Sequence, residues 1–156
     1  MIISHRGVSF DLPENSLPAF NAAWEYGVDG IEGDFHLTKD GVIVCIHDED
    51  TKRVCNQKLI IKDSTLEELK QLNLSYKDSK NSKVKIPTLA EVLKVLPSNK
   101  KIYIEIKCGV EIIKPLIKEL SRFKIDSDQA VIISFDEKII KEFKLEVPNY
   151  KAYWLY

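Results

Sequence analysis

The stretch Gly30-Ile31-Glu32-Gly33-Asp34-Phe35 decides the fold class, because apolar and acidic side chains alternate along it in the pattern of a strand. Side chains of a β-strand project alternately to its two faces, so Glu32 and Asp34 share one face while Ile31 and Phe35 share the other. The apolar face suits packing beneath helices. The acidic face is therefore expected to point toward the interior of a sheet or barrel.

Short apolar runs of this kind recur along the chain and alternate with segments of helical spacing. Strands are predicted at Ile2–Ser4, Gly30–Phe35, Val42–His47, Lys101–Lys107, Ala130–Phe135 and Lys151–Leu155. Between the first two, Leu17, Phe20 and Trp24 have helical spacing, and Gly27 follows as a residue that ends the helix. The repeated order of strand then helix predicts an α/β fold with a mainly parallel sheet and crossover helices.

Further helices are predicted from apolar spacing and from capping boxes. Ile113, Leu116, Ile117 and Leu120 form a narrow apolar stripe on one helical face. The capping-box pattern occurs at Thr65 with Glu68, at Thr88 with Glu91 and at Ser134 with Glu137. A polar insertion around 51–87 departs from the strand–helix order. It is expected to hold one short helix, Leu66–Leu72, and a Lys- and Ser-rich surface loop at Lys77–Lys85.

Composition places the chain among soluble globular proteins of one domain. Its 156 residues carry 23 Lys and Arg against 24 Asp and Glu, and 44% are hydrophobic. No basic excess is available to neutralise nucleic-acid phosphates, so a nucleic-acid partner is disfavoured. No apolar run approaches the ~20 residues of a membrane span. Three dispersed cysteines and the absence of a signal-peptide pattern favour a reducing, cytoplasmic location.

The acidic residues of two predicted strands form a candidate metal site. Glu32 and Asp34 repel each other and are costly to bury, and a hard cation with oxygen ligands, Mg²⁺ or Ca²⁺, would compensate. Glu105 in Tyr103-Ile104-Glu105-Ile106-Lys107 adds a third carboxylate, on the same face as Lys107. The alternatives are a solvent-exposed acidic face, or carboxylates paired with Arg or Lys.

Two histidines follow predicted strands, where parallel α/β proteins place their sites. His5 follows the first strand, and His47 ends the third. Two imidazoles near one metal would act as general base and general acid, whereas structural roles are the alternative. His36 is interpreted as structural or exposed, on the ground that it does not share the face of Asp34.

Two cations accompany these groups and complete the candidate chemistry. Arg6 follows His5, and Lys107 follows Glu105 by two residues. An Arg fork matches phosphate geometry, and Lys supplies a mobile point charge. A metal site, two acid–base groups and two phosphate-binding cations together indicate phosphoryl-ester chemistry.

Over residues 2 to about 155, the combined pattern resembles the glycerophosphodiester phosphodiesterase family. In chain order, it consists of His5-Arg6-Gly7, Pro13-Glu14-Asn15-Ser16, Ala19-Phe20, Gly27-Val28-Asp29-Gly30-Ile31-Glu32-Gly33-Asp34, Thr38-Lys39-Asp40-Gly41, Ile46-His47-Asp48, Ile86-Pro87-Thr88-Leu89 with Glu91-Val92-Leu93, and Ile104-Glu105-Ile106-Lys107.

This resemblance implies a (β/α)₈ barrel of the TIM type with its site at the carboxyl mouth of the strands. By resemblance, a divalent cation is held by Glu32, Asp34 and Glu105, His5 and His47 are the catalytic acid–base pair, and Arg6 and Lys107 bind the phosphodiester. The implied reaction, in lipid and glycerol metabolism, is metal-dependent hydrolysis of a small glycerophosphodiester to glycerol 3-phosphate and an alcohol.

Length separates the chain from a full barrel, which typically needs about 250 residues. Six predicted strands make residues 1–156 an incomplete TIM-like barrel domain of about six βα units. Its two open edges and an exposed Tyr153–Tyr156 end predict either association with a second copy or low solubility. The competing outcome is a monomer whose last helices fold over the gap. The alternative function is that of a catalytically impaired, truncated barrel acting in assembly or ligand binding. A sphingomyelinase-D-like lyase is disfavoured, because the chain lacks cysteine pairs.

Overall fold

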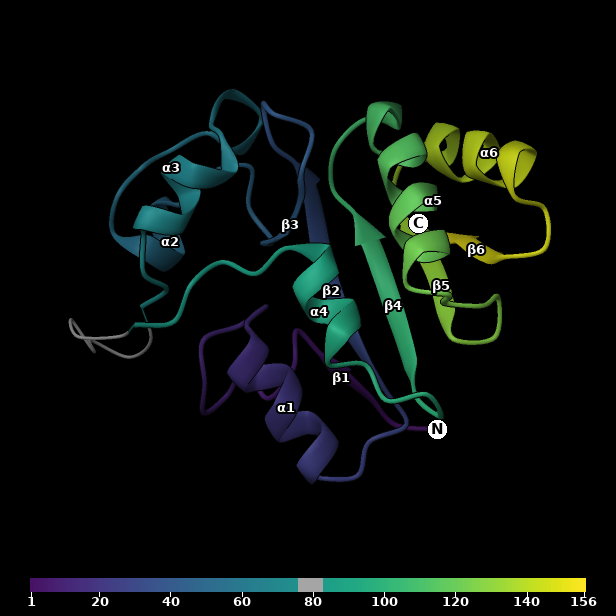
Figure 1. The fold of residues 1–156 in the computed structure, drawn as a ribbon, viewed down its shortest axis with the longest axis horizontal. Coiled ribbons are helices and arrows are strands. Elements are labelled where there is room, and N and C mark those ends of the chain that lie inside the picture. Colours follow the sequence, from purple (N-terminus) through teal and green to yellow (C-terminus); the bar gives the residue numbers. More distant parts are fainter. Residues whose placement is uncertain (76–82) are drawn as a thin grey trace.

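The computed structural model describes residues 1–75 and 83–156, and Figure 1 shows their arrangement. Part of the predicted Lys-rich loop, residues 77–82, lies outside the described residues. The strands are β1 Ile3–His5, β2 Gly30–Leu37, β3 Ile43–Cys45, β4 Lys101–Ile106, β5 Ala130–Ser134 and β6 Lys151–Trp154. The helices are α1 Leu17–Glu25, α2 Lys52–Cys55, α3 Leu66–Gln71, α4 Leu89–Lys94, α5 Ile113–Arg122 and α6 Glu137–Glu146, with 3₁₀ turns at Ile61–Asp63 and Val110–Ile112.

Five of the strands form a parallel sheet in the order β1-β2-β4-β5-β6, and β3 pairs with β2. Helices lie over the outer face of this sheet, and Figure 1 shows α4 in front of β2 and α5 in front of β5. The predicted α/β architecture of an incomplete TIM-like barrel is confirmed. Within the described residues, β1 and β6 form the two ends of the sheet. None of the described helices combines the length and the apolar composition that a membrane span requires.

The third predicted strand differs from its prediction, because β3 runs antiparallel to β2. The chain reverses directly after β2: Gly41 adopts a φ of 78°, and the Thr38 amide donates to the Val42 carbonyl at 2.9 Å. A connection this short returns the chain as a hairpin, whereas a parallel strand needs a long crossover. Residues 51–87 then follow, containing α2 and a 3₁₀ turn beside the expected helix α3.

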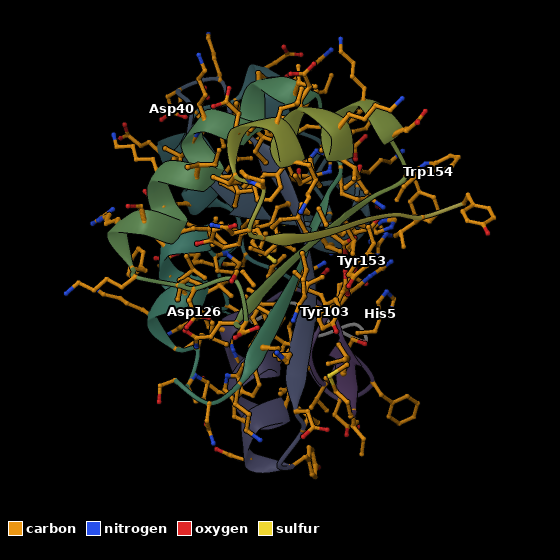
Figure 2. The ribbon with its side chains drawn as sticks, turned by 90° about the vertical axis from the view of Figure 1, so that its right-hand side faces the viewer. His5, Asp40, Tyr103, Asp126, Tyr153 and Trp154 are labelled. Atoms are coloured by element: carbon orange, nitrogen blue, oxygen red, sulfur yellow. The ribbon has the colours of Figure 1, made fainter. Side chains whose placement is uncertain are left out.

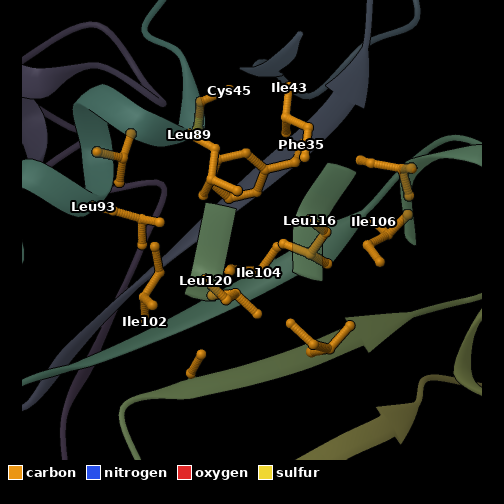
Figure 3. Close-up of a cluster of buried hydrophobic side chains, with 14 of the residues drawn as sticks. Phe35, Ile43, Cys45, Leu89, Leu93, Ile102, Ile104, Ile106, Leu116 and Leu120 are labelled. Carbon is orange, nitrogen blue, oxygen red and sulfur yellow. The ribbon is translucent and has the colours of Figure 1, made fainter. Parts of the chain in front are cut away.

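The core lies between the sheet and its outer helices, as Figure 3 shows. Phe35 of β2 and Ile104 of β4 are fully buried there, together with Leu116 of α5. Phe35 and Ile104 alternate with the acidic residues of their own strands, so the predicted alternation holds. A second, smaller cluster lies mainly within the 51–87 insertion and joins it to β3. It consists of Val44, Ile46, Val54, Ile61, Leu69, Leu74 and Ile86.

Two of the three predicted capping boxes are present, at Thr65 with Glu68 and at Thr88 with Glu91. The third prediction is wrong, because Asp136 caps α6 by accepting from the Lys138 amide. Ser134 remains in β5, where its hydroxyl donates to the Ile106 carbonyl at 3.0 Å. The Ser134 oxygen also accepts from the Asp136 amide at 3.2 Å, but Asp136 and not Ser134 is the residue that precedes the first turn of α6.

The turn after β1 brings the chain back against α1 and depends on Gly7. Arg6 and Gly7 both have positive φ values, 57° and 76°. A Cβ atom on Gly7 would lie 2.7 Å from the backbone carbon of Ala19 in α1. Any side chain at this position would therefore meet a packed helix as well as an unfavourable backbone conformation.

We predict that Gly7→Ala destabilises the fold by about 2 kcal/mol or more, since the left-handed backbone costs about 1–2 kcal/mol and overpacking adds to it. Gly41→Ala is the matched control, because Gly41 has a φ of 78° but nothing within 4 Å of a built Cβ. Urea unfolding of both variants measures the difference. Equal losses for the two variants would show that the contact with Ala19 is unimportant.

Candidate active site

Three carboxylates converge on the inner face of the sheet because of the strand register. Asp34 of β2 is aligned with Glu105 of β4, and Glu32 is aligned with His5 of β1. Aligned residues of neighbouring strands project to the same face. One ligand oxygen each from Glu32, Asp34 and Glu105 lies within 4.8 Å of the others. The structure therefore brings together the three residues that alternation along β2 and β4 selected.

These carboxylates are buried, with Asp34 at 0% exposure. Desolvation, reinforced by the charge of Asp34, raises the pKa of Glu32 to about 8. Glu32 Oε1 and Asp34 Oδ1 are buried without a hydrogen-bond partner in the described residues. Oxygens that are crowded and lack donors fit a hard divalent cation, for which carboxylates are preferred ligands. Glu32, Asp34 and Glu105 would hold such a cation.

Arg6 and Lys107 supply the positive charge that faces the carboxylates. Arg6 Nε lies 3.1 Å from Asp34 Oδ2. Lys107 Nζ donates to Glu105 Oε1 at 2.8 Å and lies 3.7 Å from Asp34 Oδ1. The alternative in which the acids pair with Arg and Lys is thus realised in part. Both cations are mostly buried against the carboxylates, with about a fifth of each side chain exposed.

The two predicted histidines reach the cluster through different residues. His5 Nε2 lies 3.7 Å from Glu32 Oε2, and its side chain is 67% exposed. Figure 2 shows His5 on the same side of the molecule as Trp154 of β6. His47 Nε2 lies 3.4 Å from Lys107 Nζ, and His47 Nδ1 lies 2.6 Å from Asp48 Oδ1. Each imidazole therefore has a ring nitrogen beside the candidate site.

The interpretation of His36 was half wrong. His36 follows Asp34 by two residues within β2, so the two side chains do share a face. The prediction of a structural role is confirmed, because His36 is buried and its Nε2 donates to the His47 carbonyl at 3.0 Å. Burial lowers the pKa of His36 and so favours the neutral ring, although the hydrogen bond to the His47 carbonyl acts in the opposite direction. His36 therefore supports the backbone of His47 and is not among the candidate ligands of the cation.

Asn15 is a site residue that the alternation of side chains along the strands does not reveal. Its amide donates to Asp34 Oδ2 at 2.8 Å, and its Oδ1 accepts from the Asp34 backbone at 3.1 Å. Asn15 has a φ of 54° and is buried in the loop before α1. A left-handed backbone is tolerated best by Gly and Asn. The only sequence signal was its place in Pro13-Glu14-Asn15-Ser16, which carries the family resemblance.

Arg53 is the second missed residue, and it joins the two loops that carry Arg6 and His47. Its guanidinium donates to both carboxylate oxygens of Glu14 at 2.8 Å and to Asp48 Oδ2 at 2.7 Å. Glu14 Oε1 also accepts from Arg6 Nη1 at 3.2 Å, while Asp48 accepts from His47. Hydrogen bonds from Arg53 lower the pKa of Asp48 to about 2, so that carboxylate is ionised at neutral pH. No periodicity marks Arg53, because it lies in the polar insertion.

The model of the glycerophosphoryl diester phosphodiesterase family matches residues 5–156, which include all seven predicted site residues. This chain belongs to that family. A glycerophosphodiester phosphodiesterase of Caldanaerobacter subterraneus is 38% identical over 162 residues, covering 100% of this chain and 66% of that protein. One from Bacillus altitudinis is 36% identical over 155 residues, covering 95% of this chain and 63% of that protein.

Solved glycerophosphodiester phosphodiesterase structures share the fold. The enzyme from Thermotoga maritima is 36% identical with a TM-score of 0.82, covering 100% of this chain and 62% of its own. A phosphodiesterase from Oleispira antarctica, solved in complex with the product sn-glycerol-3-phosphate, is 29% identical with a TM-score of 0.88, covering 96% of this chain and 63% of its own. The chain thus spans about two thirds of the length of these family members.

We predict that Glu32 makes the stability of the metal-free protein depend on pH. Its pKa is about 8 in the folded state against an ordinary value of 4.5, so the folded state binds more protons between these pH values. The free energy of unfolding therefore falls as pH rises through this window, by on the order of 5 kcal/mol in all. Glu32→Gln, which carries no ionisable group, flattens this dependence.

Urea unfolding with a chelator at pH 5, 6, 7 and 8 measures the slope for each variant. Glu67→Gln on α3 is the matched control, since Glu67 is exposed and lies outside the site. Equal slopes for Glu32→Gln and the unmodified protein would contradict the burial of an ionisable Glu32.

Proposed function

We propose that the protein hydrolyses glycerophosphodiesters to glycerol 3-phosphate and an alcohol in a reaction that needs a divalent cation, Mg²⁺ or Ca²⁺. The observation that carries this proposal is the convergence of three buried carboxylates that contact two cations and one histidine, with the second histidine beside Lys107. Membership of the family supports it, as does the glycerol 3-phosphate bound by the Oleispira antarctica relative.

The charges of the site support binding of a cation followed by an anionic substrate. Arg6 and Lys107 balance two of the three carboxylates, and the high pKa of Glu32 leaves the third protonated in the metal-free protein. A divalent cation would displace that proton and leave the site with one excess positive charge. A phosphodiester, which carries a single negative charge, would neutralise it. When bound, the cation would supply Lewis-acid stabilisation of charge on the phosphoryl oxygens.

Asp48 prepares His47 to accept a proton. The ionised Asp48 carboxylate only accepts hydrogen bonds, so His47 carries its proton on Nδ1. In the neutral ring, Nε2 then carries a lone pair, and it lies 3.4 Å from the Lys107 ammonium, which can only donate a hydrogen bond. We assign His47 the removal of a proton from the nucleophile, which is water or the glycerol 2-hydroxyl. This arrangement is the one that a general base needs.

We propose that His5 completes the proton transfer. Its Nε2 lies beside Glu32, and its exposed ring has room for a departing alcohol. We assign His5 the protonation of the leaving alkoxide. Arg6 and Lys107 hold the phosphoryl oxygens during the displacement. If the glycerol 2-hydroxyl attacks, the cyclic phosphate that forms is hydrolysed with the two histidines in exchanged roles.

We predict that the protein releases glycerol 3-phosphate from glycerophosphocholine with Mg²⁺ or Ca²⁺, and that a chelator abolishes the release reversibly. His47→Asn is expected to lower kcat by about 10²–10⁴-fold, the usual contribution of a positioned general base. Glu67→Gln is the control. Full activity with chelator would refute the metal role, and a folded chain without any release would favour the ligand-binding or assembly alternative.

We further propose that the 156-residue chain associates with a second copy through β6. Tyr153 and Trp154 of this edge strand are about half exposed, and Tyr156 is fully exposed. Figure 2 shows Tyr153 and Trp154 at the surface. An unpaired strand edge with exposed aromatic side chains is a common site of association.

Light scattering at several protein concentrations tests this proposal. Tyr153→Lys together with Tyr156→Lys is expected to shift the mass toward the monomer. Tyr26→Lys, at the exposed end of α1, is the matched control and is expected to leave the mass unchanged. A monomer mass for the unmodified chain at every concentration would overturn the proposal.

A further inference from the structure

Arg53 lies outside the seven predicted site residues but is bonded to the loops on both sides of the site. It belongs to α2, in the polar insertion, and its side chain reaches back to Glu14 in the loop after β1. The same guanidinium bonds Asp48 in the loop after β3 through Nε and Nη2, at 2.7 and 3.3 Å. Its Nε, Nη1 and Nη2 atoms all donate to carboxylate oxygens in the described residues.

Both carboxylates that Arg53 holds are bonded in turn to a residue of the proposed machinery. Asp48 Oδ1 lies 2.6 Å from His47 Nδ1. Glu14 Oε1 accepts from Arg6 Nη1 at 3.2 Å. A continuous chain of charge-assisted hydrogen bonds therefore runs from the histidine to the phosphate-binding arginine, with Arg53 at its centre. Of the described arginines, only Arg122 lies outside this series of hydrogen bonds, and it pairs with Glu119 on α5.

We propose that Arg53 is a positioning residue for the phosphodiesterase reaction, acting through Asp48 to hold His47 in its Nδ1-protonated tautomer. This inference rests on the proposed function for its effect on turnover, whereas the tautomer can be observed without any substrate. Arg53 does not reach the carboxylate cluster in any contact of the described residues. It acts on the orientation of other side chains and is not a catalytic residue.

The planar fork of arginine is what this position requires. Two carboxylates approach the guanidinium from different loops, and its fixed array of donors satisfies both at once. Without that positive charge, Glu14 and Asp48 would face each other as like charges and turn away. Asp48 would then no longer fix the imidazole, and His47 Nε2 would carry the proton for part of the time.

Arg53 is expected to matter more for turnover than for stability. Its side chain is 47% exposed, and exposed ion pairs typically contribute little to folding. Small displacements of a reacting group, by contrast, have large effects on rate. A change at Arg53 should therefore lower kcat by a larger factor than it raises the KM, while the unfolding midpoint remains close to its original value.

The experiment compares Arg53→Met and Arg53→Lys with Arg122→Met, the matched control on α5. The first measurement is the ¹⁵N NMR signal of the His47 ring nitrogens in the substrate-free protein. The second is kcat and KM for glycerophosphocholine with Mg²⁺ or Ca²⁺. We expect the unmodified protein to show the Nδ1-protonated ring. We expect Arg53→Met to show mixed tautomers and a kcat lowered by up to about 100-fold.

The outcomes separate this inference from the proposed function. Arg53→Lys is expected to recover the tautomer only in part, because one ammonium group cannot bridge both carboxylates in the same way. An unchanged His47 tautomer in Arg53→Met would overturn the inference, as would a kcat no lower than that of Arg122→Met. An inactive unmodified protein with the expected tautomer change would refute the proposed function and leave the positioning role supported.

Discussion

The register between β2 and β4 is the constraint on which the rest of the site depends. It aligns Asp34 with Glu105, and the pairing of β1 with β2 aligns His5 with Glu32. Because neighbouring residues of each strand face opposite ways, this same register sends Phe35 and Ile106 into the core between sheet and helices. A slip of one residue would exchange the two faces and bury the acids under the helices. Folding of the core and assembly of the carboxylates are therefore one event.

Crowding of the carboxylates explains the unusual features around them. Asp34 is fully buried and has partners from Arg6 and Asn15, both of which adopt left-handed backbone conformations. The backbone amide of Asn15 donates to the Arg6 carbonyl at 3.1 Å. The two residues therefore support the buried acid together. Backbone strain of this kind persists where the surrounding structure holds it, and it is common at functional sites. The elevated pKa of Glu32 shows that these partners do not compensate all three acids.

The sequence alone predicted the part of the structure that follows from periodicity and local chemistry. Alternation along β2 and β4 selected Glu32, Asp34 and Glu105, and the strand–helix order predicted the sheet. Periodicity could not reveal that β3 runs antiparallel, which depends on the tight reversal at Gly41. Asn15 and Arg53 could not be predicted as site residues from periodicity, because Asn15 lies in a loop and Arg53 lies in the 51–87 insertion. Their roles arise only when segments distant in sequence meet in the fold, as with Arg53 and Glu14, which lie 39 residues apart.

We propose above that Glu32, Asp34 and Glu105 hold a divalent cation. Anomalous scattering from a crystal of the protein soaked with Mn²⁺ tests this directly. Mn²⁺ accepts the same oxygen ligands as Mg²⁺ and scatters strongly enough to be located. We expect one anomalous peak among these three side chains, at about 2.0–2.6 Å from an oxygen of each. A site without a peak, with the Lys107 ammonium still bonded to Glu105, would contradict it and show that lysine is the counter-ion of this cluster.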